Sequence, residues 1–397
     1  MRGQSRPGTR TARFRGAALA ATAAATALAG AVLATAGTAA ASAAATGQQH
    51  FVPGAARAVF VQTDNLAGNQ VVAYHRAADG TLTPAGTYAT GGLGGQLSGS
   101  VVDHLASQGS LGYDPGPGLL FAVNAGSDTV SVFATGGDRL ALRQVIGSGG
   151  VFPVSVAVRG GLVYVLNALD GGTVQGFRVA FGRLVPIPGS ARPLGLNPAA
   201  SPQFTNTPGQ VAFSPLGTQL IVTTKANGND VDVFGVRPDG RLSPSPVVNA
   251  EPGTVPFAIA FDPAGHLVIA DAGPNALSTF ALSPVGTLTA LDSVGTGQTA
   301  TCWVASDGDL EFASNAGSAT VSGYVEHAGG QLTLAGQTPT DPGTVDAAVT
   351  PSGRFVYVQT GGNGVVDEFA VGSGGSLTEI GHVTVAGAAG GEGIVAP

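Results

Sequence analysis

Two acidic residues, Asp346 and Glu392, occupy the same place in consecutive units of an internal repeat, three residues before the end of an apolar strand. Two carboxyl groups held close together can act as general acid and general base, or can bind a cation. In the other five units the equivalent residues are Ser110, Ser155, Gln210, Ala258 and Cys302. This polar ring is the best candidate site in the sequence. The alternative is that it only lines a water-filled channel.

A few basic and nucleophilic side chains are expected near this ring. Arg192 or Lys225 could stabilise an oxyanion during catalysis. His104 could activate Cys302 as a nucleophile, and the alternative for Cys302 is a buried, inert thiol. The sequence therefore offers candidate catalytic groups of both charges at one end of the repeat strands.

We call this end of the strands the mouth, and the sequence predicts that it is acidic. Asp64, Asp103 and Glu251 are among the acids assigned to it, and Glu251 and Gln108 are also candidate substrate-binding residues. An acidic mouth favours cations, neutral sugars or basic peptides over phosphorylated substrates. Four histidines are expected on outer strands or on the opposite face: His75, His266, His327 and His382.

The elements that position these residues come from a repeat of about 45 residues. Each unit reads as four short strands, and an aromatic residue near the end of the third strand marks the period. These aromatic residues are Tyr74, Phe133, Phe177, Phe234, Phe280, Tyr324 and Phe369. Four-stranded units at this period are typical of propeller blades. We therefore predict an all-β fold, a seven-bladed β-propeller of antiparallel blades.

The two ends of the chain are predicted to close the ring. First strands end in a motif such as Phe213-Ser214-Pro215, and the chain ends on a similar one, Val395-Ala396-Pro397. The first unit lacks its own innermost strand, so the C-terminal strand should complete that blade and remove an exposed sheet edge. Two insertions, Gly91–Gly109 and Ala191–Pro208, precede first strands and should lie at the mouth, as specificity loops or as a passive cover.

The N-terminus has the composition of an export signal. Five arginines precede an Ala-rich run that ends in Ala41-Ser42-Ala43, a small-x-small cleavage site. We expect a signal peptide at residues 1–45, a linker at 46–57 and the propeller at 58–397, and hence a secreted, extracellular protein. Without the leader, 12 basic residues face 24 acidic ones, which disfavours nucleic acid and, after processing, membrane surfaces as partners. A monomer is expected.

Several units resemble the seven-bladed lactonase family, which includes 6-phosphogluconolactonase-like and carboxymuconate-cyclase-like proteins with YVTN-type repeats. The resemblance rests on stretches such as Val163-Tyr164-Val165-Leu166-Asn167 and on Gly240-Arg241-Leu242 turns. It implies hydrolysis or isomerisation of a lactone or related acid. The muconate-type members use Arg, His and Glu at the mouth, where only Arg192, His104 and Glu251 of this sequence are expected to lie.

Two functions remain open from the sequence. The first is a lactonase-like hydrolase or a cyclase/isomerase acting on a small extracellular substrate, with Glu392 or Asp346 as the base. The second is a non-catalytic propeller that binds a small molecule or an extracellular protein through its mouth. No cofactor and no metal ligand set is predicted, although a cation between Asp346 and Glu392 is a third hypothesis.

Overall fold

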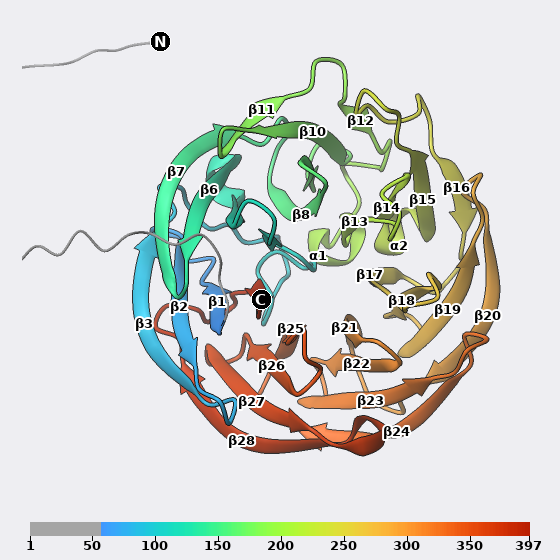
Figure 1. The fold of residues 1–397 in the computed structure, drawn as a ribbon. Coiled ribbons are helices and arrows are strands. Elements are labelled where there is room, and N and C mark those ends of the chain that lie inside the picture. Colours follow the sequence, from blue (N-terminus) through green and yellow to red (C-terminus); the bar gives the residue numbers. More distant parts are fainter. Residues whose placement is uncertain (1–56) are drawn as a thin grey trace, which may run out of the picture. The chain divides into compact units, whose positions relative to one another are not determined.

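Seven antiparallel sheets arranged in a ring form the computed structural model, which describes residues 57–397. The predicted signal peptide and all but the last residue of the predicted linker therefore lie outside the described residues. Each sheet has four main strands, and the blades follow one another along the chain (Figure 1). The seven-bladed, all-β prediction is confirmed.

Blades 1 to 3 carry the first half of the ring. Blade 1 consists of β1 (Ala58–Gln62), β2 (Gln70–Arg76), β3 (Leu82–Ala89) and the C-terminal β29 (Ile394–Val395). Blade 2 consists of β4 (Leu111–Asp114), β5 (Leu119–Asn124), β6 (Thr129–Gly136) and β7 (Arg139–Gly147). Blade 3 consists of β8 (Pro153–Arg159), β9 (Leu162–Asn167), β10 (Thr173–Ala180) and β11 (Arg183–Pro186), with the short β12 (Arg192–Pro193) also paired to β10.

Blades 4 to 7 complete it. Blade 4 consists of β13 (Val211–Phe213), β14 (Gln219–Thr223), β15 (Asp230–Gly235) and β16 (Val247–Ala250). Blade 5 consists of β17 (Pro256–Phe261), β18 (Leu267–Asp271), β19 (Ala276–Leu282) and β20 (Leu288–Gly295). Blade 6 consists of β21 (Thr301–Asp307), β22 (Leu310–Asn315), β23 (Thr320–Glu326) and β24 (Leu332–Pro339). Blade 7 consists of β25 (Thr344–Val349), β26 (Phe355–Thr360), β27 (Val365–Val371) and β28 (Leu377–Thr384).

Helical structure within residues 57–397 is limited to four single turns. These are η1 (Ala125–Ser127), α1 (Gln203–Asn206), α2 (Lys225–Gly228) and η2 (Ser373–Gly375). None of the helices described is long and apolar enough to span a membrane. The turns α1 and α2 lie at the mouth and help to shape the second insertion.

Ring closure follows the predicted route. The C-terminal β29 pairs antiparallel with β1, placing Val395 opposite Phe60 and Ile394 opposite Val61. The Gln62 amide also donates a hydrogen bond of 2.8 Å to the Gly393 carbonyl. The last residues of the chain therefore supply the innermost strand of blade 1, and the two ends of the described chain are held together by a sheet.

Buried tyrosines join neighbouring blades. The Tyr164 hydroxyl in β9 donates a 2.6 Å hydrogen bond to the Gly240 carbonyl in a turn of blade 4. Tyr357 in β26 does the same to Gly80 in blade 1, also at 2.6 Å. Both acceptors are glycines with positive φ, which the tight turn requires. The apolar second strands thus pack between blades and also fix the outer turns of the next blade.

Candidate functional site

The first insertion covers the mouth of the channel. Its second half, residues 97–109, which we call the cover segment, crosses the centre of the ring (Figure 1). The His104 amide donates to the Gly390 carbonyl at 2.8 Å, and the Gln108 amide donates to the Gly209 carbonyl at 3.2 Å. The Gln108 side chain forms a pair of hydrogen bonds with the backbone of Val304, at 2.8 and 2.9 Å. The cover segment therefore contacts blades 4 and 6 and also Gly390, which lies just before β29.

Two glycines allow this close approach. A Cβ atom at Gly361 would overlap the Val102 carbonyl, and one at Gly390 would overlap the His104 ring. Residues Leu105, Ala106 and Ser107 of the cover segment are almost completely buried. Of the two roles predicted for the first insertion, the structure shows the covering one.

Four buried acids gather at the covered mouth, three beneath the cover segment and Asp103 within it, and we call them the channel cluster: Asp64, Asp103, Asp346 and Glu392. The Ser107 hydroxyl donates to Glu392 Oε1 at 2.5 Å, and the Ser107 amide donates to Oε2 at 3.2 Å. The Glu392 amide in turn donates to Asp64 Oδ2 at 2.9 Å. Beyond the effect of burial, the charges of Asp103, Asp346 and Asp64 each raise the pKa of Glu392, which places all four acids near one another.

Burial changes the protonation of this cluster. It raises the pKa of Asp64 and of Asp346 to about 7, and the pKa of Asp103 to about 6. Burial, together with the adjacent charge of Asp103, raises the pKa of Glu392 well above its usual range. At neutral pH the cluster therefore holds both protonated and ionised carboxyl groups, which is what general acid and general base catalysis requires.

Lys225 is the buried cation next to the cluster. Its Nζ donates hydrogen bonds to the Ala106 carbonyl at 2.5 Å, the Phe204 carbonyl at 2.7 Å and the Thr207 hydroxyl at 3.1 Å. These acceptors come from both insertions, so one side chain ties the two loops together. Burial lowers the pKa of Lys225 to about 8, while the charges of Asp103 and Glu392 oppose that shift.

The neutral members of the predicted ring connect the innermost strands of neighbouring blades. The Ser155 hydroxyl of blade 3 accepts a hydrogen bond from the Val211 amide of blade 4 at 3.3 Å. The Gln210 side chain accepts one from the Ile259 amide of blade 5 at 2.5 Å. The Ser110 hydroxyl donates to the Glu392 carbonyl at 3.0 Å. Each of these three side chains thus forms a hydrogen bond with a backbone group of a neighbouring blade or of the segment before β29.

Cys302 and His104 are placed in surroundings that disfavour their ionised forms. Burial raises the pKa of the Cys302 thiol to about 12, so the thiol is protonated at neutral pH and is a weak nucleophile. Burial also lowers the pKa of His104. The His104 Nδ1 atom has no hydrogen-bond partner among the described residues.

Arg192 and Glu251 are not brought to the channel cluster. Arg192 lies in β12 at the outer edge of blade 3, and its guanidinium donates to the carbonyls of Ser243 and Leu242, each at 2.8 Å. Glu251 lies between β16 and β17, where its charge raises the pKa of Asp271. The predicted position of Arg192 beside the channel is thus corrected. The first residues of the Ala191–Pro208 insertion form β12 at the outer edge of blade 3, far from the centre of the ring.

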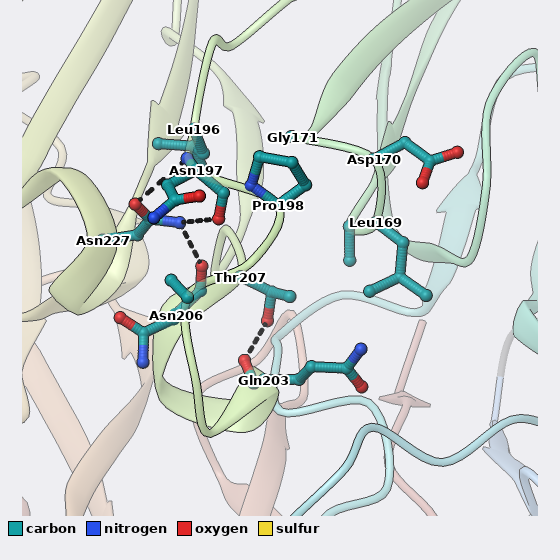
Figure 2. Close-up of a pocket in the computed structure, with 12 residues that line it drawn as sticks. Leu169, Asp170, Gly171, Leu196, Asn197, Pro198, Gln203, Asn206, Thr207 and Asn227 are labelled. Atoms are coloured by element: carbon teal, nitrogen blue, oxygen red, sulfur yellow. Dashed lines mark hydrogen bonds between the residues drawn. The ribbon is translucent and has the colours of Figure 1, made fainter.

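Two cavities lie near the channel. A polar one of about 20 Å³ under the second insertion has room for a single water molecule, and its Asn227 side chain already donates to Asn197 and Asn206 (Figure 2). The other, of about 440 Å³, opens at the far end of the channel. Small and apolar residues of the innermost strands line it, among them Ala260, Val304 and Ala348. Neither cavity exposes the carboxyl groups of the channel cluster.

Sequence reasoning assigned Asp64 and Asp103 to the mouth without including them in the site. Asp64 follows the second strand of its unit and Asp103 lies in an insertion, so neither shares the strand position that identified Asp346 and Glu392. Ser107 and Trp303 gave no signal as site residues. The Trp303 indole N–H donates a 2.6 Å hydrogen bond to the Ser107 carbonyl and so fixes the residue that holds Glu392.

Replacing Trp303 with Phe is expected to lower the free energy of unfolding by about 1–3 kcal/mol, because the buried Ser107 carbonyl loses its donor. Phenylalanine retains an aromatic ring against Phe257, whose ring centroid lies 5.0 Å from that of Trp303. Urea denaturation followed by circular dichroism measures the change. An unchanged unfolding midpoint would show that this hydrogen bond does not stabilise the cover segment.

Comparisons with known proteins agree with this architecture. The family described as "Lactonase, 7-bladed beta-propeller" matches residues 100–390. No curated protein matches the sequence. Solved structures similar to the chain include a putative 6-phosphogluconolactonase from Bacteroides fragilis, with 18% identity and a TM-score of 0.67 over 84% of this chain and 96% of that one.

Two further structures have the same fold. The periplasmic gluconolactonase of Pseudomonas aeruginosa is 19% identical, with a TM-score of 0.68 over 85% of this chain and 98% of that one. A protein from Lactobacillus plantarum is 20% identical, with a TM-score of 0.69 over 85% of this chain and 98% of that one. The match to the family covers most of the described blades. The chain therefore belongs to the seven-bladed β-propeller lactonase family.

Proposed function

We propose that the chain is an exported hydrolase of small, uncharged lactones, and that the channel cluster carries out the reaction. One observation carries this proposal: four carboxyl groups are buried in one cluster, and the charges of two of them, Asp103 and Glu392, act on the buried Lys225 ammonium. Burying carboxyl groups costs free energy, and Ser or Gln occupies the ring position in other blades at lower cost. Buried acids whose pKa values move towards neutrality are typical of functional sites.

The chemistry assigns one role to each group. Asp103, with a pKa of about 6, is the ionised base that takes a proton from water as the water oxygen attacks the lactone carbonyl. The three N–H groups of Lys225 are occupied by Ala106, Phe204 and Thr207, so its ammonium stabilises the resulting oxyanion through its positive charge. Glu392, protonated at neutral pH, then donates its proton to the ring oxygen as the carbon–oxygen bond breaks. The product is the hydroxy acid. At the end of the reaction Asp103 carries one more proton and Glu392 one fewer.

Charge supports an uncharged substrate. The chain has 24 acidic residues, and beside the four acids of the channel cluster Lys225 is the cation that the structure brings close. A phosphorylated lactone would be repelled by this field, whereas a neutral lactone would not. The leader and the similarity to a periplasmic gluconolactonase support the same class of substrate in an exported protein.

A second function is favoured by the closed mouth. The cover segment buries the carboxyl groups, and Leu97 and Leu105 anchor it in the apolar core. A substrate reaches the cluster only if this segment moves. A propeller whose mouth stays closed would instead bind a ligand or a protein on the outer surface of the cover, without catalysis.

Replacing Glu392 with Gln is expected to reduce the rate of lactone hydrolysis about 10²–10⁴-fold, because the amide cannot donate the proton. The assay follows acid release from D-glucono-δ-lactone, an uncharged lactone, by the purified protein. The control is Glu379→Gln, which removes an exposed carboxyl group on blade 7. Equal activity of the Glu392 variant would exclude the assigned role. A wild-type protein inactive on uncharged lactones would leave the binding function.

A further inference from the structure

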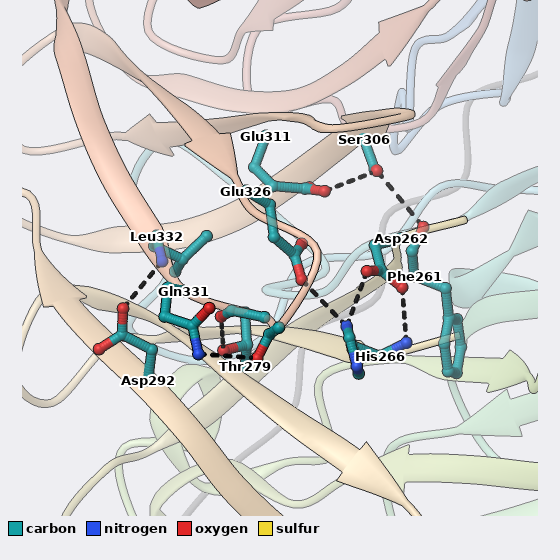
Figure 3. A network of polar contacts seen from close by, with 12 residues as sticks. Phe261, Asp262, His266, Thr279, Asp292, Ser306, Glu311, Glu326, Gln331 and Leu332 are labelled. Carbon is teal, nitrogen blue, oxygen red and sulfur yellow. Dashed lines mark hydrogen bonds and ion pairs between the residues drawn. The ribbon is translucent and has the colours of Figure 1, made fainter. Parts of the chain in front are cut away.

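A second cluster of acids lies on the face opposite the mouth, between blades 5 and 6. Asp262 is in the turn between β17 and β18, His266 precedes β18, and Glu326 ends β23. One side-chain atom from each of the three lies within 4.8 Å of the other two. Figure 3 shows both carboxyl groups directed at the His266 ring. The sequence places His266 on this face without giving it a role.

The three side-chain atoms are close enough to one another to share a single metal ion. His266 Nδ1 lies 2.8 Å from Asp262 Oδ2 and 3.5 Å from Glu326 Oε1. Ligands that are each about 2.0–2.1 Å from a tetrahedral zinc ion lie about 3.3 Å from one another. One imidazole and two carboxylates form a common set of protein ligands for zinc, with a water as the fourth.

The turn alone requires only part of Asp262. Its Oδ1 accepts the His266 amide at 2.6 Å, and the hydroxyls of Ser214 and Thr350 accept equivalent amides in blades 4 and 7. A hydroxyl group is therefore sufficient to cap this turn. The additional oxygen of Asp262, Oδ2, is the one that contacts the imidazole.

The two acids of blade 6 occupy positions that are not acidic in the other blades. Glu326 lies two residues after the aromatic that marks the repeat, where the other blades have Arg76, Thr135, Val179, Val236, Leu282 and Val371. Glu311 pairs with that aromatic across the sheet, where the other blades have Val59, Leu120, Val163, Leu220, Leu267 and Val356. An apolar residue satisfies the fold at both positions, so the acids have another purpose.

Three of the four carboxylate oxygens of Glu311 and Glu326 accept no hydrogen bond from the described residues. Glu326 is 3% exposed; its Oε1 has the 3.5 Å contact with His266, and neither carboxylate oxygen accepts a hydrogen bond of good geometry from the described residues. Glu311 is fully buried; its Oε1 accepts the Ser306 hydroxyl at 2.7 Å, while Oε2 has no partner. Two carboxyl groups, Asp262 and Glu326, thus face one imidazole, and a divalent cation would balance their charge.

We propose that Asp262, His266 and Glu326 bind one zinc ion, which ties blade 5 to blade 6. Glu311 is a positioning residue: it is held by the Ser306 hydroxyl next to Glu326 and is not itself a ligand. The ion has a structural role, because the cluster lies on the face opposite the channel cluster. The site does not depend on the proposed hydrolase function.

Calorimetric titration of chelator-treated protein with zinc chloride tests the proposal. We expect saturable binding of one zinc ion per chain, and affinity at least about ten-fold lower in His266→Gln and Glu326→Gln. The control is His75→Gln. His75 Nδ1 also lies near a carboxylate, Asp138, at 3.3 Å, but within residues 57–397 no third ligand joins this pair. The control should bind zinc as the wild type does.

Thermal unfolding keeps the test decisive if a variant folds poorly. Zinc should raise the Tm of the wild type and of His75→Gln, and should leave that of His266→Gln unchanged. Glu311→Gln, which keeps all three ligands, should bind zinc about 10–100-fold more weakly. The proposal is overturned if the wild type shows no saturable zinc binding, or if His266→Gln binds as tightly as the wild type.

Discussion

Raising the pH from 5 to 8 is expected to lower the free energy of unfolding by about 3 kcal/mol or more. The pKa of Asp64 and of Asp346 is about 7 in the folded protein, against an ordinary value of 3.8. Between these two values the folded chain binds more protons than the unfolded chain, so stability falls as the pH rises. One fully buried group with this shift accounts for about 3 kcal/mol across that range. Burial shifts Asp271 and Asp232 in the same direction.

Urea denaturation at pH 5, 6, 7 and 8 measures this dependence. In Asp346→Asn the free energy of unfolding should fall less between pH 5 and 8, by the contribution of one carboxyl group, because the amide does not titrate. The control is Asp79→Asn on a surface turn, where the pKa of the carboxyl is slightly lowered by Thr81 and the slope should not change. Lys225 contributes little to the pH dependence between pH 5 and 7. Its pKa is about 8 in the folded protein, so it is protonated in both the folded and the unfolded chain over that range. Stability that increases from pH 5 to 8 would contradict the buried, raised acids of the channel.

The fold could be predicted from the sequence because the same unit occurs seven times. A single strand such as Ala58–Gln62 is a short apolar run of ambiguous meaning, but seven such runs at a fixed period identify a blade. Ring closure by the C-terminal strand could be predicted because Val395-Ala396-Pro397 repeats an internal motif. Periodicity fixes which strands pair and which side chains share a face.

The candidate site was only partly predictable, for a physical reason. Strand positions placed Asp346 and Glu392 in the channel, since side-chain alternation applies there. The paths of the two insertions follow no period, so the burial of Ser107 over Glu392 and the distance of Arg192 from the channel could not be derived. Contacts between blades, such as the one from Gln210 to Ile259, depend on how closely the innermost strands approach one another, which the sequence does not specify.

Replacing Lys225 with Met is expected to lower the free energy of unfolding at pH 7 by about 3–5 kcal/mol. The side chain is 1% exposed, and methionine fills nearly the same volume, so little of the loss comes from a cavity. The change leaves the carbonyls of Ala106 and Phe204 without their donor and removes the positive charge beside Asp103 and Glu392. Both insertions should then be cleaved more readily by proteases.

The pH dependence of this variant separates the lost charge from the lost hydrogen bonds. The Lys225 ammonium lowers the pKa of Asp103, so without it the ionised carboxylate becomes more costly in the folded state. The loss of stability should therefore be larger at pH 7 than at pH 5, where Asp103 is mostly protonated in both proteins. Thr207→Val, which removes one acceptor of the ammonium and retains its charge, should cost about 1 kcal/mol at either pH. A loss in the Lys225 variant that is small, or independent of pH, would mean that the ammonium does not compensate the acids of the channel cluster.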